Sequence, residues 1–187
     1  MTALLILIGI VVVLGIWVMA MYNGLVAGRN QVEAAWGQID VQLKRRHDLI
    51  PNLVQVVKDY MGYERETLEA VIKARNSAVN ASATGDRTGQ IQAENQLSGA
   101  LGKLFALSEN YPDLKANQNV SSLQEELTGT ENKIAFSRQH YNDSVMSQNT
   151  RVESFPSGIV AGMFKFAKHP YFEVPAAEKE PIKVNLR

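Results

Sequence analysis

The first 28 residues of the chain contain no Asp, Glu, Lys, Arg or His. Residues 3–22 within this stretch are almost wholly apolar, and about 20 apolar residues in a helix cross the roughly 30 Å hydrocarbon core of a bilayer. The span is expected to begin near Ala3. Trp17 and Tyr22 lie toward its C-terminal end, where aromatic rings favour the membrane interface. The sequence therefore predicts a single N-terminal transmembrane helix.

A cleaved signal peptide is the competing interpretation of this segment. Signal peptides have a basic N-terminal region, a shorter apolar stretch and a cleavage site flanked by small residues. The α-amino group is the only positive charge ahead of the apolar run here, and the run is longer than a signal peptide needs. We therefore expect residues 1–28 to form an uncleaved anchor and its junction.

Basic residues follow the predicted span, and none precedes it. Arg29 comes first, and Lys44, Arg45 and Arg46 come later. The positive-inside rule favours an external N-terminus and a cytoplasmic C-terminal domain for such a single-pass protein. The later basic residues lie beyond the roughly 15–20 residues over which the rule is strongest, so the reverse orientation stays open.

After the span, apolar residues recur at steps of three and four, which is typical of helices packed along their lengths. The first stripe runs from Val32 to Val79 and stays in phase across Pro51. This favours a kinked but continuous helix, although a stop and a restart at the proline are left open. Residues 81–89 contain two glycines among small polar residues and predict a turn.

Two further stripes cover residues 97–111 and 120–155. Pro112 is predicted to end the second helix or to start a tight corner, and Ser121 or Ser122 to cap the third. Short connections favour antiparallel neighbours. The sequence therefore predicts an all-α fold in which the single transmembrane helix continues into a long antiparallel, up-and-down bundle of three or four helices.

Three regions are expected along the chain. Residues 1–28 form the anchor and junction, residues 29–155 the helical bundle, and residues 156–187 a tail with aromatic residues and prolines. The tail is expected to be extended and loosely held from Val174 onward. Its Phe164, Phe166 and Phe172 are predicted to contact the membrane or a protein partner.

Several charged residues lie on or beside the apolar stripes. They are Arg46, Glu64, Arg75, Glu109, Glu131 and Arg138. A charge in a helical seam costs several kcal/mol unless it is paired, and the guanidinium fork fits a carboxylate. We therefore predict inter-helix Arg–Glu pairs that set which helix faces which and at what offset. An internal polar site for a ligand or a proton is the alternative.

Patterns typical of catalysis or cofactor binding are missing from the sequence. His47, His140 and His169 form no HExxH and no i, i+4 pair, so no metal site is predicted. Phosphate-binding glycine motifs and the serine motifs GxSxG and SxxK are missing as well, and there is no cysteine. The 19 Lys and Arg balance the 19 Asp and Glu. We therefore expect no catalytic residue, no cofactor and no nucleic-acid partner.

Several blocks of the sequence resemble the signature of the LemA family, in the same order along the chain. They are Tyr22-Asn23, Arg29-Asn30, Trp36, residues 38–60, Glu64, residues 104–117, residues 123–127, Glu131, Arg138, Tyr141-Asn142, Asn149 and Phe155-Pro156. The resemblance covers about residues 20 to 172. Val120 stands where an aromatic residue is usual, and Tyr63 where a histidine often precedes the glutamate.

The resemblance implies a bacterial protein with one N-terminal span and an antiparallel helical bundle. No enzymatic activity is established for the family, so it supplies no catalytic residue. Relatives take part in magnetosome membrane formation, and members are often encoded beside membrane metalloproteases or TPM-domain proteins. The expected location is the bacterial inner membrane, with the orientation argued above.

We therefore expect a non-enzymatic, membrane-anchored helical scaffold that self-associates and organises or remodels bacterial membrane. Its expected partners are the lipid bilayer and further copies of itself. The hypothesis depends on a span continuous with a long helix, since residues 23–80 would extend roughly 87 Å if helical throughout. The alternative is a monomeric, membrane-tethered adaptor that recruits a protein partner such as a membrane protease.

Overall fold

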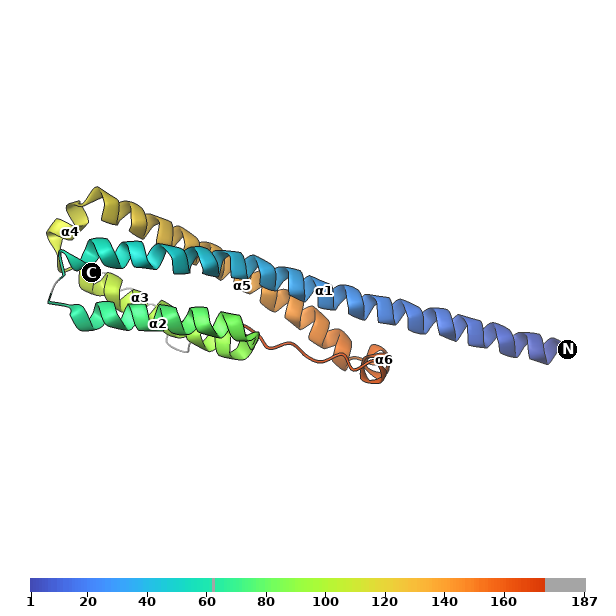
Figure 1. Cartoon of the computed structure of the whole chain (residues 1–187). Coiled ribbons are helices and arrows are strands. Elements are labelled where there is room, and N and C mark those ends of the chain that lie inside the picture. The colour runs from blue at the N-terminus through green and yellow to red at the C-terminus, as the bar shows by residue number, and fades with distance from the viewer. Residues whose placement is uncertain (62, 174–187) are drawn as a thin grey trace, which may run out of the picture. The chain divides into compact units, whose positions relative to one another are not determined.

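A computed structural model describes residues 1–61 and 63–173, so the predicted loose end from Val174 lies outside the described residues. Helices alone make up the regular structure of this part of the chain (Figure 1). They are α1 (Thr2–Lys58), α2 (Arg65–Thr84), α3 (Arg87–Ser108), α4 (Pro112–Ala116), α5 (Gln118–Glu153) and α6 (Ser157–Met163). The predicted all-α fold, in which a long N-terminal apolar helix is followed by a helical bundle, is confirmed.

Helix α1 contains both the predicted span and the first helix of the bundle. Pro51 lies inside the helix, so the chain does not stop and restart there. The side chains of residues 1–17 are all exposed. None of the strongly apolar segment of α1 near the N-terminus is buried. By length and composition α1 can therefore cross a membrane, and its apolar segment does not pack as the core helix of a soluble domain would.

The prediction of one helix through residues 32–79 is wrong beyond Lys58. Backbone N–H groups of Tyr60 and Met61 both donate to the Val57 carbonyl at 3.0 Å, and α2 begins only at Arg65. Met61 is fully buried where the chain turns. The stripe of α2 therefore faces that of α1 instead of prolonging it, because a repeat of apolar residues does not reveal where the chain reverses.

The other connections are tighter than the sequence predicted. Gly85 ends α2 with φ of 73°, a left-handed conformation that glycine adopts at little cost, and the Asp86 side chain accepts from the Thr88 N–H at 3.0 Å. The turn thus needs two residues, not the nine predicted. Helix α5 begins at Gln118, since the Asn117 side chain accepts from the Asn119 N–H at 2.9 Å. The prediction of a serine cap is therefore wrong.

The chain divides into two compact units, each of which is described by itself. Unit 1 contains Met1–Ile39 and Phe136–Tyr171, and unit 2 contains Asp40–Ala135 together with the chain from Phe172 onward. The region boundaries expected at residues 28 and 155 stay a prediction. Helices α1 and α5 contribute to both units.

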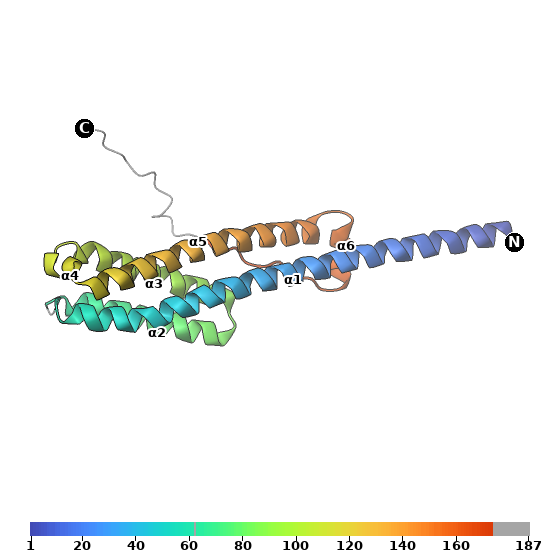
Figure 2. The same ribbon diagram turned by 90° about the horizontal axis from the view of Figure 1, so that it is seen from above.

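Unit 2 is an up-and-down bundle of residues 40–58 of α1, helices α2 and α3, and residues 118–135 of α5. Figures 1 and 2 both show α2 and α3 side by side as an antiparallel hairpin. The buried core is aliphatic and includes Ile50, Leu53, Val57, Leu68, Val71, Leu97, Leu101, Leu104, Val120 and Leu127. Every helix of the bundle contributes to this cluster, which is why the apolar stripes recur at helical spacing.

Unit 1 joins residues 1–39 of α1 to the C-terminal part of α5 and to α6. The Trp36 and Tyr141 rings lie 5.1 Å apart, and farther along the pair Gln148 Nε2 donates to the Leu25 carbonyl at 3.2 Å. The two segments therefore run antiparallel. After α5 the chain returns as α6 beside α1 (Figure 2). Val160 of α6 forms a small buried cluster with Leu25 of α1.

Candidate functional site

Arg46 is the largest fully buried side chain of unit 2. It lies on α1 and reaches carboxylates on two other helices. Its Nη2 donates to Glu94 on α3, and its Nη1 donates to Glu131 Oε2 on α5 at 2.6 Å. The same Nη1 donates to Ser98 Oγ on α3 at 2.9 Å. One guanidinium thus links three helices through charge-assisted hydrogen bonds.

Glu94 is the buried partner in this cluster, with a side chain that is 0% exposed. His47 Nε2 lies 2.9 Å from its Oε1, so a protonated His47 would form a second ion pair. Burial raises the pKa of the Glu94 carboxyl, but the contact with His47 and the charge of Arg46 lower it by more. The net effect is a pKa below the ordinary value, and Glu94 is ionised at neutral pH.

Glu131 closes the cluster on its outer side. Its side chain is 40% exposed, and its Oε1 accepts from Ser98 Oγ at 3.2 Å. A cavity of about 270 Å³ adjoins it and is lined by Arg46, Ser98, Leu101, Gly102, Phe105, Leu127, Thr128, Glu131 and Asn132. The cluster is therefore buried at Glu94 and exposed to solvent at Glu131.

This arrangement is suited to holding helices in register and poorly suited to catalysis. The Ser98 hydroxyl donates to a carboxylate already paired with Arg46, so no neutral base is placed to activate it. No group of three or more His, Asp or Glu that could hold a metal occurs among residues 1–61 and 63–173. The geometry therefore agrees better with a structural ionic cluster than with an active site.

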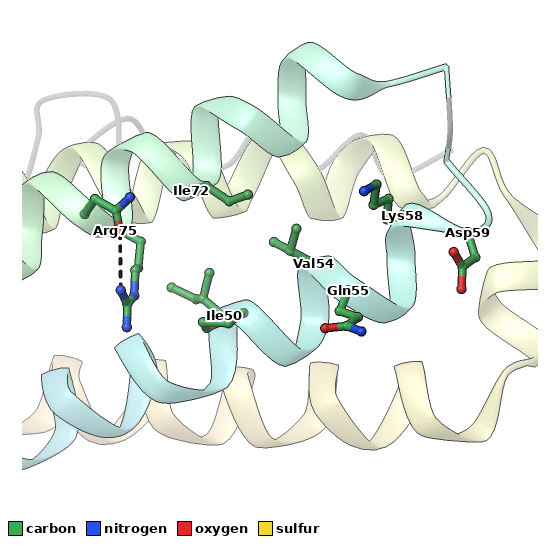
Figure 3. A pocket seen from close by; sticks show the side chains of 9 residues that line it. Ile50, Val54, Gln55, Lys58, Asp59, Ile72 and Arg75 are labelled. Atoms are coloured by element: carbon green, nitrogen blue, oxygen red, sulfur yellow. Dashed lines mark hydrogen bonds between the residues drawn. The ribbon is translucent and has the colours of Figure 1, made fainter.

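A groove between α1 and α2 is the second feature of unit 2. Its volume is about 550 Å³, and it is lined by Ile50, Pro51, Val54, Gln55, Lys58, Asp59, Ile72, Arg75 and Asn76. Figure 3 shows the aliphatic side chains extending into the space between the two helices, with Lys58 and Asp59 at one end and Arg75 at the other. The lining offers apolar contact and a few charges, and its residues form no acid–base pair of the kind used in catalysis.

Two further residues of the predicted set, Glu64 and Arg75, hydrogen-bond to groups that carry no charge. Arg75 Nε donates to the His47 carbonyl at 3.1 Å, and Glu64 Oε1 accepts from the Tyr111 hydroxyl at 3.1 Å. Partial burial and this hydrogen bond raise the pKa of Tyr111. Glu109 is exposed at the end of α3, and Arg138 is buried in unit 1. Of the six, Arg46 and Glu131 are brought together as an inter-helix ion pair.

Two of the three predicted contact phenylalanines lie beside the anchor. The Phe164 and Phe166 ring centroids are 4.7 Å and 5.9 Å from that of Tyr22, and Phe164 is 51% exposed. Phe172 is only 1% exposed, and the carbonyl of the following residue accepts from Asn95 Nδ2 in unit 2. Phe172 therefore has no free surface for lipid or a partner, which corrects the expectation, because the end of the tail packs back on the bundle.

Glu94 and Ser98 are not among the predicted residues. Glu94 lies three residues before Leu97, so one further step along the second apolar stripe would have found it. Ser98 gives no such signal, since a serine beside a stripe is ordinary.

Comparison with known proteins places the chain in a family. A model of the LemA family matches residues 35–186, which include the ionic cluster, the groove and α6. The chain belongs to the LemA family. Protein LemA of Metamycoplasma hominis is 24% identical over 160 residues, which cover 86% of this chain and 72% of that protein.

Two magnetosome proteins are also similar to this LemA-family chain. Magnetosome protein MamQ of Magnetospirillum gryphiswaldense is 23% identical over 184 residues, covering 86% of this chain and 68% of that protein. Magnetosome protein MamQ 2 of Paramagnetospirillum magneticum gives the same identity and coverage. With the exposed apolar part of α1, these likenesses indicate a membrane-associated helical protein.

Proposed function

We propose that this LemA-family protein is a non-enzymatic scaffold that is anchored by one span, self-associates and organises or remodels bacterial membrane. One observation carries the proposal: no loop separates the anchor from the folded part of unit 1. Helix α1 leaves the apolar segment and, without a break, presents Leu25, Val32 and Trp36 to the core. A folded unit held in this way transmits its orientation to the span, whereas a flexible tether would not.

The proposal includes self-association because one span alone has little effect on the shape of a bilayer. A single span perturbs the bilayer only locally, so a scaffold that shapes a membrane needs many copies held in fixed relation. The likeness to two magnetosome proteins supports the membrane-associated part of the proposal. The ionic cluster supports the non-enzymatic part, because its charged groups are used to pair with one another.

The full-length protein in mild detergent tests the proposal. Mass photometry and cross-linking should show assemblies larger than a monomer, and electron microscopy of the protein in vesicles should show ordered arrays or deformed membrane. The chain has no cysteine, so Phe136→Cys and Ile134→Cys form a clean pair for cross-linking. Phe136 is 76% exposed and Ile134 is 0% exposed, so any link between copies should form at residue 136 and not at residue 134.

A purely monomeric protein in detergent and in vesicles would overturn the scaffold proposal. Monomers that bring down one protein partner in stoichiometric amount would support the adaptor alternative instead. The groove between α1 and α2 favours the adaptor alternative. Ile72 lines this groove and is 42% exposed, so a partner could cover it. Ile72→Asp should then release the partner, while Lys73→Asp on the same helix should not.

A further inference from the structure

Helix α6 has two apolar faces. One face packs on α1, where Val160 and Ala161 are 4% and 1% exposed beside Leu25. The other face is open: Ile159 is 59% exposed and Met163 70% exposed. Phe164, directly after the helix, continues this open face. Three large apolar side chains on so short a segment form a patch that water does not favour.

The place of this patch along α1 indicates what covers it. Val18 and Met21 pack against the buried cluster that Leu25 forms with Val160 and Ala161 of α6, and the ring centroids of Tyr22 and Phe164 lie 4.7 Å apart. A segment beside residues 18–25 lies at the depth where the span leaves the hydrocarbon. Figure 1 shows α6 beside α1. From there toward the N-terminus, no other helix among the described residues of unit 1 lies beside α1. The exposed patch is thus continuous with the exposed surface of the span.

The backbone around α6 is suited to that depth because its end is closed by internal hydrogen bonds. The N–H groups of Phe164, Lys165 and Phe166 donate to carbonyls of α6 at 3.1, 3.3 and 2.9 Å. At the other end, Ser157 Oγ donates to the Arg151 carbonyl at 2.7 Å. Few polar groups of the segment are therefore left to be stripped of water when it meets lipid.

Basic side chains surround the same region. Arg29, Arg151, Lys165 and Lys168 are exposed, and the Arg29 guanidinium lies 5.6 Å from the centre of the Phe166 ring. The acidic residues of this region are fewer: Glu153 pairs with Lys168, and Glu33 lies one turn of α1 from Arg29. The excess of positive charge matches the phosphates of an anionic membrane surface, which attract Lys and Arg just outside a span.

We propose that α6 is a second membrane contact, which inserts Ile159, Met163 and Phe164 into one leaflet beside the anchor. The basic residues around it bind the anionic headgroups of that leaflet. The occupant of the patch is therefore lipid, and unit 1 rests on the membrane as a wedge in one leaflet. This inference rests on the membrane anchor of the proposed function but not on self-association.

Fluorescent labels at single cysteines test the inference. Full-length Met163→Cys and Phe136→Cys carry the environment-sensitive label NBD in vesicles of phosphatidylcholine and phosphatidylglycerol. Both positions are exposed, but residue 136 lies about 22 Å farther along α5 from Arg151. The label at residue 163 should shift to shorter wavelength and lose most of its intensity to lipids with a doxyl quencher on the acyl chain. The label at residue 136 should do neither.

A third label, at Ile10→Cys in the middle of the span, distinguishes failure of the α6 contact from failure of the membrane anchor. Quenching at residue 10 without quenching at residue 163 would overturn the inference and leave the anchor intact. No quenching at either position would overturn the anchor itself. A label at residue 163 that is shielded from aqueous iodide but not reached by lipid quenchers would show a protein cover, which also overturns the inference.

Discussion

The most consequential single residue is the buried Arg46. Its guanidinium is removed from water and relies on Glu94 and Glu131 to offset the lost hydration. The two carboxylates lie on different helices, so sliding either helix by one turn would leave a buried charge without a partner. A buried ion pair of this kind adds little net stability, but it penalises wrong registers strongly.

Removing one partner of the cluster should therefore cost far more than removing two. We expect Arg46→Met to lower the free energy of unfolding by about 3–5 kcal/mol, because Glu94 remains buried without its main partner. The double variant Arg46→Met with Glu94→Met should recover most of this loss. Denaturant unfolding followed by circular dichroism measures both. Equal stability of the single and double variants would contradict the argument.

The lowered pKa of Glu94 predicts how stability depends on pH. The folded-state pKa lies below the unfolded value of about 4.3, so ionised Glu94 stabilises the fold fully above that pH. This contribution is lost as the pH falls through the folded-state pKa. The melting temperature of the unchanged protein should therefore fall in acid. The melting temperature of Glu94→Gln should be lower at neutral pH and should fall less steeply as the pH decreases.

Glu109→Gln is the matched control for this pH series, since Glu109 is an exposed glutamate at the end of the same helix. Its melting temperature should follow that of the unchanged protein. Identical acid slopes for Glu94→Gln and the unchanged protein would show that Glu94 does not carry this contribution.

At the scale of helices, the pairing of α1 with α5 in unit 1 depends on a close approach at Gly28. A Cβ atom at this position would overlap Gln148 Oε1 and lie 3.3 Å from Arg151 Nη1. Gln148 is 1% exposed and cannot swing freely aside. Two glycines four residues apart, such as Gly24 and Gly28, permit close approach of a second helix. In this structure Gly28 provides that close contact between α1 and α5 of the same chain.

Two alanine substitutions separate packing from helix propensity. Gly24→Ala should be neutral or stabilising by up to about 1 kcal/mol, because nothing lies within 4 Å of the added atom. Gly28→Ala has the same propensity gain but displaces Gln148 and its hydrogen bond to Leu25, so it should be less stable than Gly24→Ala by about 1–2 kcal/mol. Thermal unfolding in mild detergent compares the two, and equal melting temperatures would refute the close approach.

At the scale of the whole molecule, the distribution of basic residues bears on orientation. The exposed Arg29, Arg151, Lys165 and Lys168 all belong to unit 1, on the side of the anchor that carries the folded domain. Because the fold brings residues 151–168 beside the end of the span, more basic residues lie close to the membrane there than the chain order suggests. This favours a cytoplasmic location for the folded part.

Labelling with a membrane-impermeant maleimide should establish the orientation. In cells whose outer membrane has been opened, Thr2→Cys should react, and Glu109→Cys should react only after the inner membrane is permeabilised. Both positions are exposed, so accessibility of the side chain does not limit the reaction. The opposite pattern would show that the folded part lies outside the cytoplasm.

Local patterns in the sequence were sufficient for the span and for the buried faces of the helices. Of the first stripe, predicted to run from Val32 to Val79, the residues up to Val57 are all buried, whereas Tyr60, the next residue of the stripe, is 40% exposed. The cost of exposing an apolar side chain to water is nearly the same whatever covers it, so a periodic pattern reports the buried face without reporting the neighbour. The position of Arg46 on the buried face of α1 follows in the same way.

Only the tertiary structure shows which segments pack against one another. The reversal after Lys58, the pairing of Arg46 with Glu94, the burial of Phe172 and the packing of α6 on the end of the span each join segments far apart in sequence. Such contacts depend on where the chain turns and on how closely two surfaces fit, which a repeat along one helix does not encode.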